Sequence, residues 1–588
     1  MSNSLNIKAM KKILYSLVIL FLCSCEGLDQ LPKDSISPET YFFTENDLRL
    51  FTNGFYDALP SAEGVYNESA DNIIKNSLTD EVRGSRLIPT SGGGWTWTNL
   101  RRINYYLQNS HKCTDKKARI RYDALARFFR AYFYSGMVQR FGDVPWINTA
   151  MDSNDKEAMQ KPRDSRVLIV DSIISDLDYA IKELPTSKKV NEISRWTALA
   201  LKAKVCLSEG TFRKYHDNLG LPGATELLTE AVTAAEELMT DGGYKKYTST
   251  PDKAYGELFS SLTPIESEII LARCFSDDLT IRHNLNYYTT TSSYGKPGLE
   301  KAVVNLYLMS DGSRFTDIPG YNTKDFYEET QGRDPRLSQT IRTPGYTRIG
   351  ETVTRAPDFG ASVSGYQLIK FVTEPKYDQY NISINPMPIF RYAETLLIFA
   401  EAKAELGTLT QEDLDKSIKL LRDRAGMLKL EKDVANANPD PYLAAMHPNV
   451  TGVNKGVILE IRRERGIELV MENFRYADLM RWKNGSLVTR TFKGMYFPGI
   501  GSYDLDKNGT IDVIIYDGEK PSISGPVLLK LNEEIVLENG TSGLVLINSD
   551  IDKKFDETKD YLYPIPIQER LLNNNLTQNP GWKDGLSF

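Results

Sequence analysis

Oxygen-bearing side chains recur at alternate positions in one acidic stretch near the end of the chain. These residues are Asp504, Asp506, Asn508, Thr510 and Asp512. They match ligand positions 1, 3, 5, 7 and 9 of an EF-hand calcium loop, and Gly509 matches its glycine at position 6. Position 12, where that loop has a bidentate Glu, is Ile515. The spacing predicts either a structural Ca²⁺ site or an ion-free turn rich in Asx residues, and it indicates no other cofactor.

Two stretches place aromatic rings among planar polar side chains. A sugar needs this pairing, because its C–H face stacks on a flat ring while its hydroxyls need hydrogen-bond partners. The first stretch is Gly-rich and runs from Thr79 to Trp97. Its candidate ligand contacts are Asp80, Arg83, Arg86 and Trp95. Because a helix begins at Trp97, we expect the Trp97 ring in the core and the Trp95 ring at the surface.

The second stretch runs from Asn284 to Tyr294 and contributes Tyr287, Tyr288 and Tyr294 as candidate contacts. Tyr321, in a Pro-Gly-Tyr-Asn turn, is a weaker third candidate. The alternative for all of these tyrosines is that they pack against their own loop.

The sequence lacks the motifs of several classes of protein. There is no GxSxG elbow, and the only Gly-Lys pair, Gly295-Lys296, is followed by Pro297 rather than Ser or Thr, so neither a serine hydrolase nor a P-loop is indicated. The 4 His have no HExxH spacing. A net charge of −7 without a basic block argues against a nucleic-acid binder. Glycosidase carboxylates follow no spacing rule, so the 78 acids do not exclude one.

The N-terminus has the pattern of an export signal. Lys8, Lys11 and Lys12 precede an apolar run from Ile13 to Cys23, which is too short to span about 30 Å of hydrocarbon. The run ends in a pattern like a bacterial lipobox, with Cys25 as the residue that would receive lipid. A plain secretory signal is the alternative, and Met10 is an alternative start. We expect the remaining thiols, Cys113, Cys206 and Cys274, to be free and buried.

Apolar residues at helical spacing predict a mainly α-helical fold. The expected helices are 45–59, one containing 125–136 and ending at Gly142, 165–184, 196–207, 224–240, 388–406, 411–425 and 456–483. Between about 245 and 385 the chain is rich in Gly, Pro, Ser, Thr and Tyr, which predicts loops and short strands such as Tyr366 to Val372. Small residues suit closely packed helix pairs.

Five segments, in order, resemble the SusD/RagB family of Bacteroidetes outer-membrane lipoproteins. They are Ala126 to Ile147, Ser194 to Leu207, Pro388 to Leu406, Glu460 to Lys483 and Tyr561 to Trp582. The resemblance implies tetratricopeptide-like helix pairs carrying an irregular, loop-rich ligand-binding part with short β-strands. It also implies a lipid-anchored protein at the cell surface that binds glycan and delivers it to a SusC-like TonB-dependent transporter in the outer membrane, without catalysis.

Two other functions stay open: a surface glycan hydrolase or lyase, and a peptide-binding lipoprotein of the same family. In the segment from Glu460 to Lys483, acids and bases at i, i+3 and i, i+4 spacing predict scaffold ion pairs rather than a catalytic carboxylate pair. The expected division is a signal peptide (1–24), a tether and first helix (25–60), a first helical part (61–245), a loop-rich ligand-binding part (246–385), a second helical part (386–484) and an irregular C-terminal part (485–588).

Overall fold

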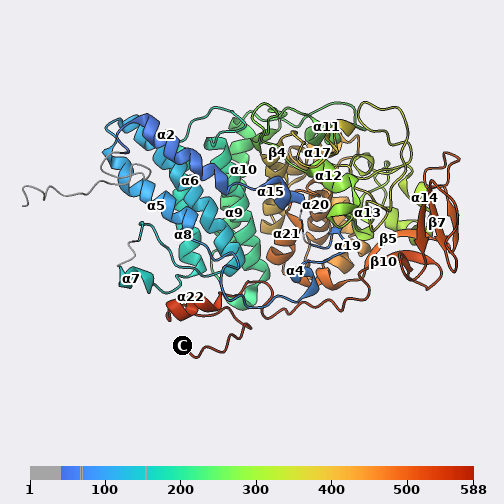
Figure 1. The fold of residues 1–588 in the computed structure, drawn as a ribbon. Coiled ribbons are helices and arrows are strands. Elements are labelled where there is room, and N and C mark those ends of the chain that lie inside the picture. Colours follow the sequence, from blue (N-terminus) through green and yellow to red (C-terminus); the bar gives the residue numbers. More distant parts are fainter. Residues whose placement is uncertain (1–40, 67, 69, 152–154) are drawn as a thin grey trace, which may run out of the picture.

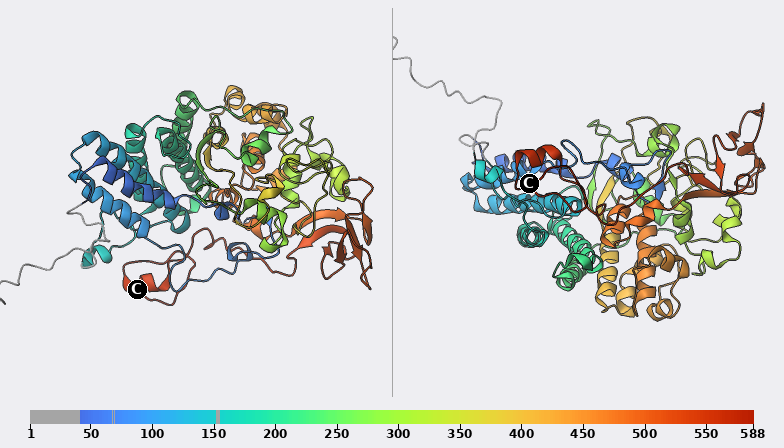
Figure 2. Two further views of the ribbon diagram at one scale, coloured as in Figure 1. Left: turned by 45° about the horizontal axis from the view of Figure 1, so that its top comes forward. Right: turned by 90° about the horizontal axis from the view of Figure 1, so that it is seen from below.

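The structure is a computed structural model, and it describes residues 41–66, 68, 70–151 and 155–588. The predicted signal peptide, Cys25 and most of the predicted tether lie outside these residues. The described chain is mainly helical, with four small β-sheets. Helices fill one end and the middle of the molecule, and the loop-rich part and the C-terminal strands lie at the other end (Figures 1 and 2).

The first helical part is built from antiparallel neighbours, as predicted. Its main helices are α2 (Glu45–Asn53), α5 (Thr98–Asn109), α6 (Lys116–Phe141), α8 (Arg166–Glu183), α9 (Arg195–Tyr215) and α10 (Ala224–Asp241). Ser165 caps α8 through a bond from Leu168 N to its Oγ. Gly142 ends α6 with φ 72°, which favours glycine. Helix α6 packs on α8, and α9 packs on α10.

The second helical part differs from the prediction at three places, and one of them is the predicted helix 411–425, which is divided at Lys416 and Ser417. Its helices are α15 (Tyr392–Leu406), α16 (Gln411–Asp415), α17 (Ile418–Arg424), α18 (Lys432–Ala437), α19 (Pro441–Met446), α20 (Lys455–Glu468) and α21 (Arg475–Arg481). Residues 387–391 form strand β4 rather than the start of a helix. The predicted helix 456–483 is broken, because Met471 and Asn473 take positive φ values of 61° and 62° between α20 and α21.

The strands are short and confined to small sheets. Strand β2 (Ile269–Arg273) pairs with β4 (Met387–Arg391), and β1 (Ile73–Ile74) pairs with β3 (Gly298–Leu299), both antiparallel. The C-terminal strands are β5 (Phe492–Phe497), β6 (Gly501–Tyr503), β7 (Val513–Tyr516), β8 (Val527–Lys530), β9 (Val536–Leu537) and β10 (Gly543–Ile547). The predicted strand 366–372 is wrong, since only Gln367 and Leu368 form isolated bridges there.

The end of the chain returns along the helical parts, so that α22 (Ile567–Leu572) lies below α8 in Figure 1. The segment before α22 is extended, and Tyr563 N bonds Arg140 O at 2.8 Å. Cys113 and Cys206 are free and buried as predicted, whereas Cys274 is exposed. Among the described residues no helix combines the length and apolar character that a membrane span requires.

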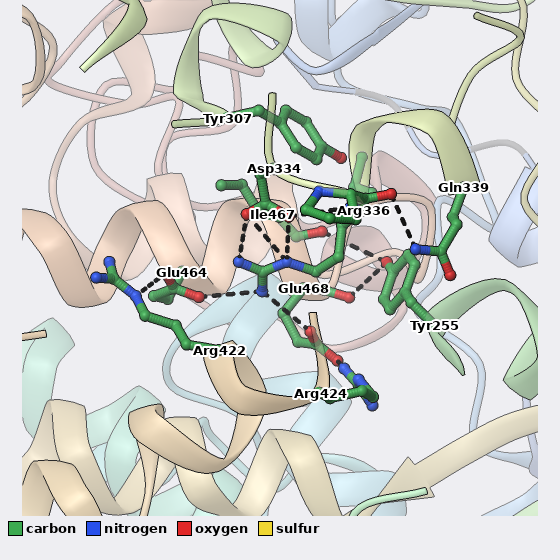
Figure 3. Close-up of polar contacts among 12 residues, drawn as sticks. Tyr255, Tyr307, Asp334, Arg336, Gln339, Arg422, Arg424, Glu464, Ile467 and Glu468 are labelled. Atoms are coloured by element: carbon green, nitrogen blue, oxygen red, sulfur yellow. Dashed lines mark hydrogen bonds and ion pairs between the residues drawn. The ribbon is translucent and has the colours of Figure 1, made fainter. Parts of the chain in front are cut away.

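Buried ion pairs join the loop-rich part to α20 (Figure 3). Arg336 lies in the loop-rich part, and its guanidinium is 2.7 Å from Asp334, 3.0 Å from Glu464 and 3.4 Å from Glu468. Arg422 and Arg424 approach the same two glutamates from α17. Burial opposes the charged form of Glu468, but the surrounding arginines outweigh it and hold its pKa well below the usual range. Within the segment from Glu460 to Lys483, Arg463 pairs with Glu460 and Arg481 with Asp478 at i, i+3 spacing, so the predicted scaffold ion pairs are confirmed.

The same cluster continues through the break after α20. Glu472 is 2.7 Å from both Arg391 and the ammonium of Lys370. Lys370 also donates to Val470 O at 2.7 Å and to the Tyr255 hydroxyl at 2.8 Å. The positive φ values after α20 therefore turn the chain so that Glu472 meets two cations from other segments. We call Glu268, Asp334, Arg336, Lys370, Arg391, Arg422, Arg424, Glu464, Glu468 and Glu472 the buried ion network.

Removing one member of the buried ion network leaves its partners charged and without compensation. We expect Arg336→Met to lower the free energy of unfolding by about 3–5 kcal/mol. The matched control is Lys419→Ala, which breaks a half-exposed pair with Asp423 and should change stability by no more than about 0.5 kcal/mol. Urea unfolding measures both, and equal effects of the two variants would contradict the role assigned to Arg336.

A second buried acid, Glu68, ties the segment before β1 to the N-terminus of α21. Its Oε1 accepts bonds from Asn72 Nδ2 (2.9 Å) and Arg475 N (3.2 Å), whereas Oε2 accepts no hydrogen bond from the part of the chain that the structure describes. Burial raises the pKa of Glu68 to about 7, against the opposing effect of these donors. The folded state thus binds this proton more tightly than the unfolded chain, where the pKa is near 4.5. The resulting stabilisation is present below pH 4.5 and is lost as the pH rises through about 7.

The variant Glu68→Gln mimics the protonated form at every pH. We expect the free energy of unfolding of the variant, relative to that of the wild type, to rise by about 1–3 kcal/mol as the pH increases from 4.5 to 8. Unfolding of both proteins across this pH range is the measurement. A stability difference that does not change with pH would show that Glu68 keeps an ordinary pKa.

Candidate functional site

Four tyrosines form an aromatic cluster on the loop-rich part. Tyr287 and Tyr288 lie on α12 (Leu285–Thr290), Tyr294 ends the 3-10 turn η4 (Ser292–Tyr294), and Tyr380 comes from a distant loop. The ring centroids of Tyr287 are 5.6 Å from those of Tyr294 and 5.7 Å from those of Tyr380, both edge to face. Tyr288 lies 4.0 Å from Tyr294 and is buried, whereas Tyr380 is 62% exposed. We call this cluster the tyrosine platform.

Buried polar groups fix α12 against the Tyr380 loop. His283 donates from Nε2 to Asn385 O (2.8 Å) and accepts at Nδ1 from Leu285 N (3.2 Å), so its ring is neutral. Burial lowers the pKa of His283 to about 4, in agreement with this tautomer. Asn284 Oδ1 accepts from Asn381 N, next to Tyr380. These bonds fix the spacing between Tyr287 and Tyr380.

Asn286 links the platform to the segment that carries Lys370. Its Oδ1 accepts from Thr373 N at 2.8 Å, and its Nδ2 donates to Asp378 at 3.2 Å. Asp378 in turn pairs with Arg348 at 2.7 Å. The buried ion network holds Lys370, and Asn286 therefore transmits that constraint to α12.

Polar side chains from the β1 region border the platform. Asn76 N donates to Gly295 O at 2.9 Å, and a Cβ on Gly295, where φ is 80°, would lie 3.0 Å from Asn76 Oδ1. Burial lowers the pKa of Lys75 to about 8, and the nearby Glu63 carboxylate opposes this shift. The same carboxylate acts on Tyr288. An amide, an amine and a carboxylate thus lie on the side of the platform formed by Tyr288 and Gly295.

The Gly-rich stretch differs from the prediction at Trp95 and at Arg86. Trp95 was expected at the surface, but it is only 5% exposed and its ring packs against Trp97 (5.3 Å) and Phe141 (4.9 Å). Trp97 is partly buried and packs against the core, as expected. The reason is that the loop folds onto the start of the helix: Trp95 N bonds Gly92 O at 2.8 Å, and Arg140 Nε bonds Gly93 O at 3.0 Å. The ring face that we expected to meet a ligand is covered.

Arg86 is also buried rather than available at the surface. Its guanidinium is 3.1 Å from Asp560 and lies 4.5 Å from the ring centroid of Tyr563. Lys554 N bonds Arg83 O at 3.2 Å, and a Cβ on Gly84 would lie 2.1 Å from Lys554 O. The stretch therefore holds the returning C-terminal segment in place.

The remaining predicted contacts lie apart from one another. Asp80 and the Arg83 side chain are exposed, and Asp80 accepts a bond from Ser85 Oγ at 2.7 Å. Tyr321 packs against Phe315 at 5.9 Å in a turn beside β5 and β10. The structure thus brings together the three tyrosines of 284–294, and it adds Tyr380, which the sequence analysis missed. The Tyr-Asp-Gln-Tyr-Asn run at 377–381 was the only local signal for it.

The predicted calcium loop connects β6 to β7. One carboxylate oxygen each from Asp504, Asp506 and Asp512 lies within 4.8 Å of the others. Burial raises the pKa of Asp506 and of Asp512, and the neighbouring carboxylates add to both shifts. Backbone N–H groups satisfy part of the set, since Gly509 N donates to Asp504 at 2.7 Å and Leu505 N to Asp512 at 2.8 Å.

Ile515 is buried in β7, so the twelfth position supplies no ligand. Three carboxylates, together with Asn508 and Thr510, could hold Ca²⁺ and fix this turn between strands, and calcium binding stays a prediction.

Comparison with known proteins gives consistent matches. A model of the SusD family matches residues 267–582, and a model described as starch-binding, associating with the outer membrane, matches residues 60–199. A SusD-like protein of Formosa agariphila is 23% identical, and the alignment covers 97% of this chain and 99% of that protein.

Crystal structures show the same fold. A SusD-like protein of Bacteroides fragilis superposes with a TM-score of 0.68 at 20% identity, covering 94% of this chain and 100% of that one. A SusD-like carbohydrate binding protein of Bacteroides fragilis superposes with a TM-score of 0.67 at 20% identity, covering 92% and 100%. The mainly helical architecture with small sheets is therefore that of these proteins.

Calcium should stabilise the loop by neutralising its three carboxylates. We expect added Ca²⁺ to raise the thermal unfolding midpoint of chelator-treated protein, with an affinity of about 10⁻⁴–10⁻³ M, as in extracellular calcium modules. The double variant Asp506→Asn/Asp512→Asn should lose this response. Asp517→Asn, an exposed acid outside the cluster, is the matched control and should keep it. No response in the wild type, or the same response in the double variant, would exclude the site.

Proposed function

This chain belongs to the SusD family, and we propose that it is a cell-surface protein that captures an oligo- or polysaccharide and delivers it to a SusC-like TonB-dependent transporter. The observation that carries the proposal is the tyrosine platform, where the exposed Tyr380 stands beside the half-buried Tyr287 and Tyr294. The carbohydrate-binding relative of the same fold supports the ligand class.

The chemistry of the platform suits a pyranose chain. An exposed phenol ring offers a flat face to the C–H side of a sugar, and it is held at its edge by a second ring, so that little freedom is lost on binding. Asn76, Lys75 and Glu63 border the rings and can exchange hydrogen bonds with hydroxyls. The platform is an exposed surface rather than a closed pocket, so that a long glycan could bind with both of its ends free.

We also propose that the protein binds glycan without cleaving it, and that its buried glutamates are not catalytic. Glycosidases need two carboxylic groups flanking one bond, about 5–9.5 Å apart. Glu464, Glu468 and Glu472 on and after α20 are buried in ion pairs with arginines and lysine, which keeps them ionised and away from ligand. Product release from a bound oligosaccharide would favour the hydrolase or lyase alternative.

In this proposal Cys25 carries the lipid that attaches the protein to the outer membrane. More than one acyl chain there would give stable attachment.

Because Arg86 is buried, acidic groups on a glycan would have to meet Lys75 or the exposed Arg83 instead.

The tyrosine platform can be tested at its most exposed ring. A panel of plant, host and microbial oligosaccharides identifies a ligand by calorimetric titration of the wild type. We expect Tyr380→Ala to weaken its binding about tenfold, or ~1.4 kcal/mol, because the stacking surface is lost.

The matched control is Tyr380→Phe, which keeps the ring and removes only the hydroxyl, and its affinity should stay close to that of the wild type. Unchanged affinity in Tyr380→Ala would move the site away from the platform. Binding of peptides and of no glycan would overturn the ligand class.

A further inference from the structure

A cavity of about 290 Å³ lies inside the helical scaffold, away from the residues of the tyrosine platform. It is bounded by α6, α9, β4, α15 and the α20–α21 turn. Its volume is at the small end of ligand sites, which begin near 300 Å³. Tyr132, Phe390 and Phe474 give it aromatic walls, and Gln139 and Ser208 add polar groups. We call it the scaffold cavity.

One buried carboxylate oxygen in its wall, Glu394 Oε1, lacks a hydrogen-bond partner in the described part of the chain. The ammonium of Lys204 on α9 is 3.4 Å from Glu394 Oε1 on α15, which is an ion pair without a hydrogen bond. Glu394 is only 3% exposed. Lys204 otherwise faces the rings of Phe474 (4.2 Å) and Phe390 (5.6 Å). A buried carboxylate normally has hydrogen-bond donors, because losing water without replacement costs free energy.

Other charges in the same wall are compensated. Asp478 pairs with Arg465 (2.7 Å) and with Arg481 (2.9 Å), and Glu472 belongs to the buried ion network. Arg465 still has one buried nitrogen, Nη1, to which no described residue offers an acceptor. The cavity therefore offers a ligand both kinds of hydrogen-bonding group. Glu394 Oε1 can accept a hydrogen bond, and the Lys204 ammonium and Arg465 Nη1 can donate one.

Gly136 keeps one side of the cavity open. It lies within α6, where glycine is less favourable than alanine by roughly 0.5–1 kcal/mol. A Cβ at this position would have no heavy atom within 4 Å, and the residue is exposed. Gly136 is therefore bordered by open space rather than by a closely packed helix, and a larger side chain at this position would extend into that space.

We propose that the scaffold cavity is a second carbohydrate site, which takes a single pyranose residue, free or at the end of a glycan. Adjacent hydroxyls of a sugar both donate and accept, so one ligand can give hydrogen bonds to Glu394 and receive them from Lys204. Its apolar face would lie against the Phe390 side of the cavity. The site is separate from the tyrosine platform and does not depend on it.

The test uses a background variant, Tyr287→Ala/Tyr380→Ala, so that the platform contributes nothing. Saturation-transfer difference NMR is recorded with an equimolar mixture of glucose, galactose, mannose, rhamnose and xylose. We expect a signal from at least one sugar. Adding Gly136→Leu should weaken that binding at least tenfold by occupying the opening, whereas Thr229→Leu, on the exposed face of α10, should not.

A second variant covers the case in which Gly136→Leu misfolds. Lys204→Met/Glu394→Leu removes both charges together, so neither is left buried alone, and it should abolish the sugar signal with the thermal midpoint retained. No signal from any sugar in the background variant, or a signal that survives both changes, would overturn the proposal. Binding of glycine or acetate instead of sugars would overturn the ligand class. Each outcome is independent of oligosaccharide binding at the platform.

Discussion

The arrangement of the molecule depends on the burial of charge around Glu464 and Glu468. These acids project from α20 into a region without solvent, and each is neutralised by cations from other segments: Arg336 from the loop-rich part and Arg422 and Arg424 from α17. A buried charge is tolerated only with its partners in place. The loop-rich part, which has little regular structure, is therefore fixed in one position relative to the helices.

That constraint extends to the surface. Glu472 forms an ion pair with Lys370, and Thr373, three residues later, donates a backbone hydrogen bond to Asn286. Asn286 lies on α12, the helix that carries Tyr287. The neutral His283 and the Asn284–Asn381 contact complete the attachment of the Tyr380 loop. The proposed binding surface is thus attached to the helical parts by buried contacts, and a surface fixed in this way would lose less entropy when a sugar binds.

The helices of the first part were predictable because their signals are local. Apolar spacing, the Ser165 cap and the Gly142 stop each act within one or two turns. The break between α20 and α21 was not predictable, because it serves Arg391 and Lys370, which are distant in sequence. For the same reason Trp95 was assigned to the wrong surroundings: the covering contacts come from Phe141 and Arg140. Three platform tyrosines are neighbours in sequence and were found, whereas Tyr380 joins them only through tertiary contacts.

The central claim is that ligand is captured at the tyrosine platform and not at the Gly-rich stretch. Hydrogen–deuterium exchange of the protein with and without a bound oligosaccharide tests this directly, because it reports on both segments in one experiment. The account predicts slower exchange in residues 284–295 and 378–382 on binding, with no change in residues 80–97. Slower exchange in 80–97 with none at the platform would contradict it.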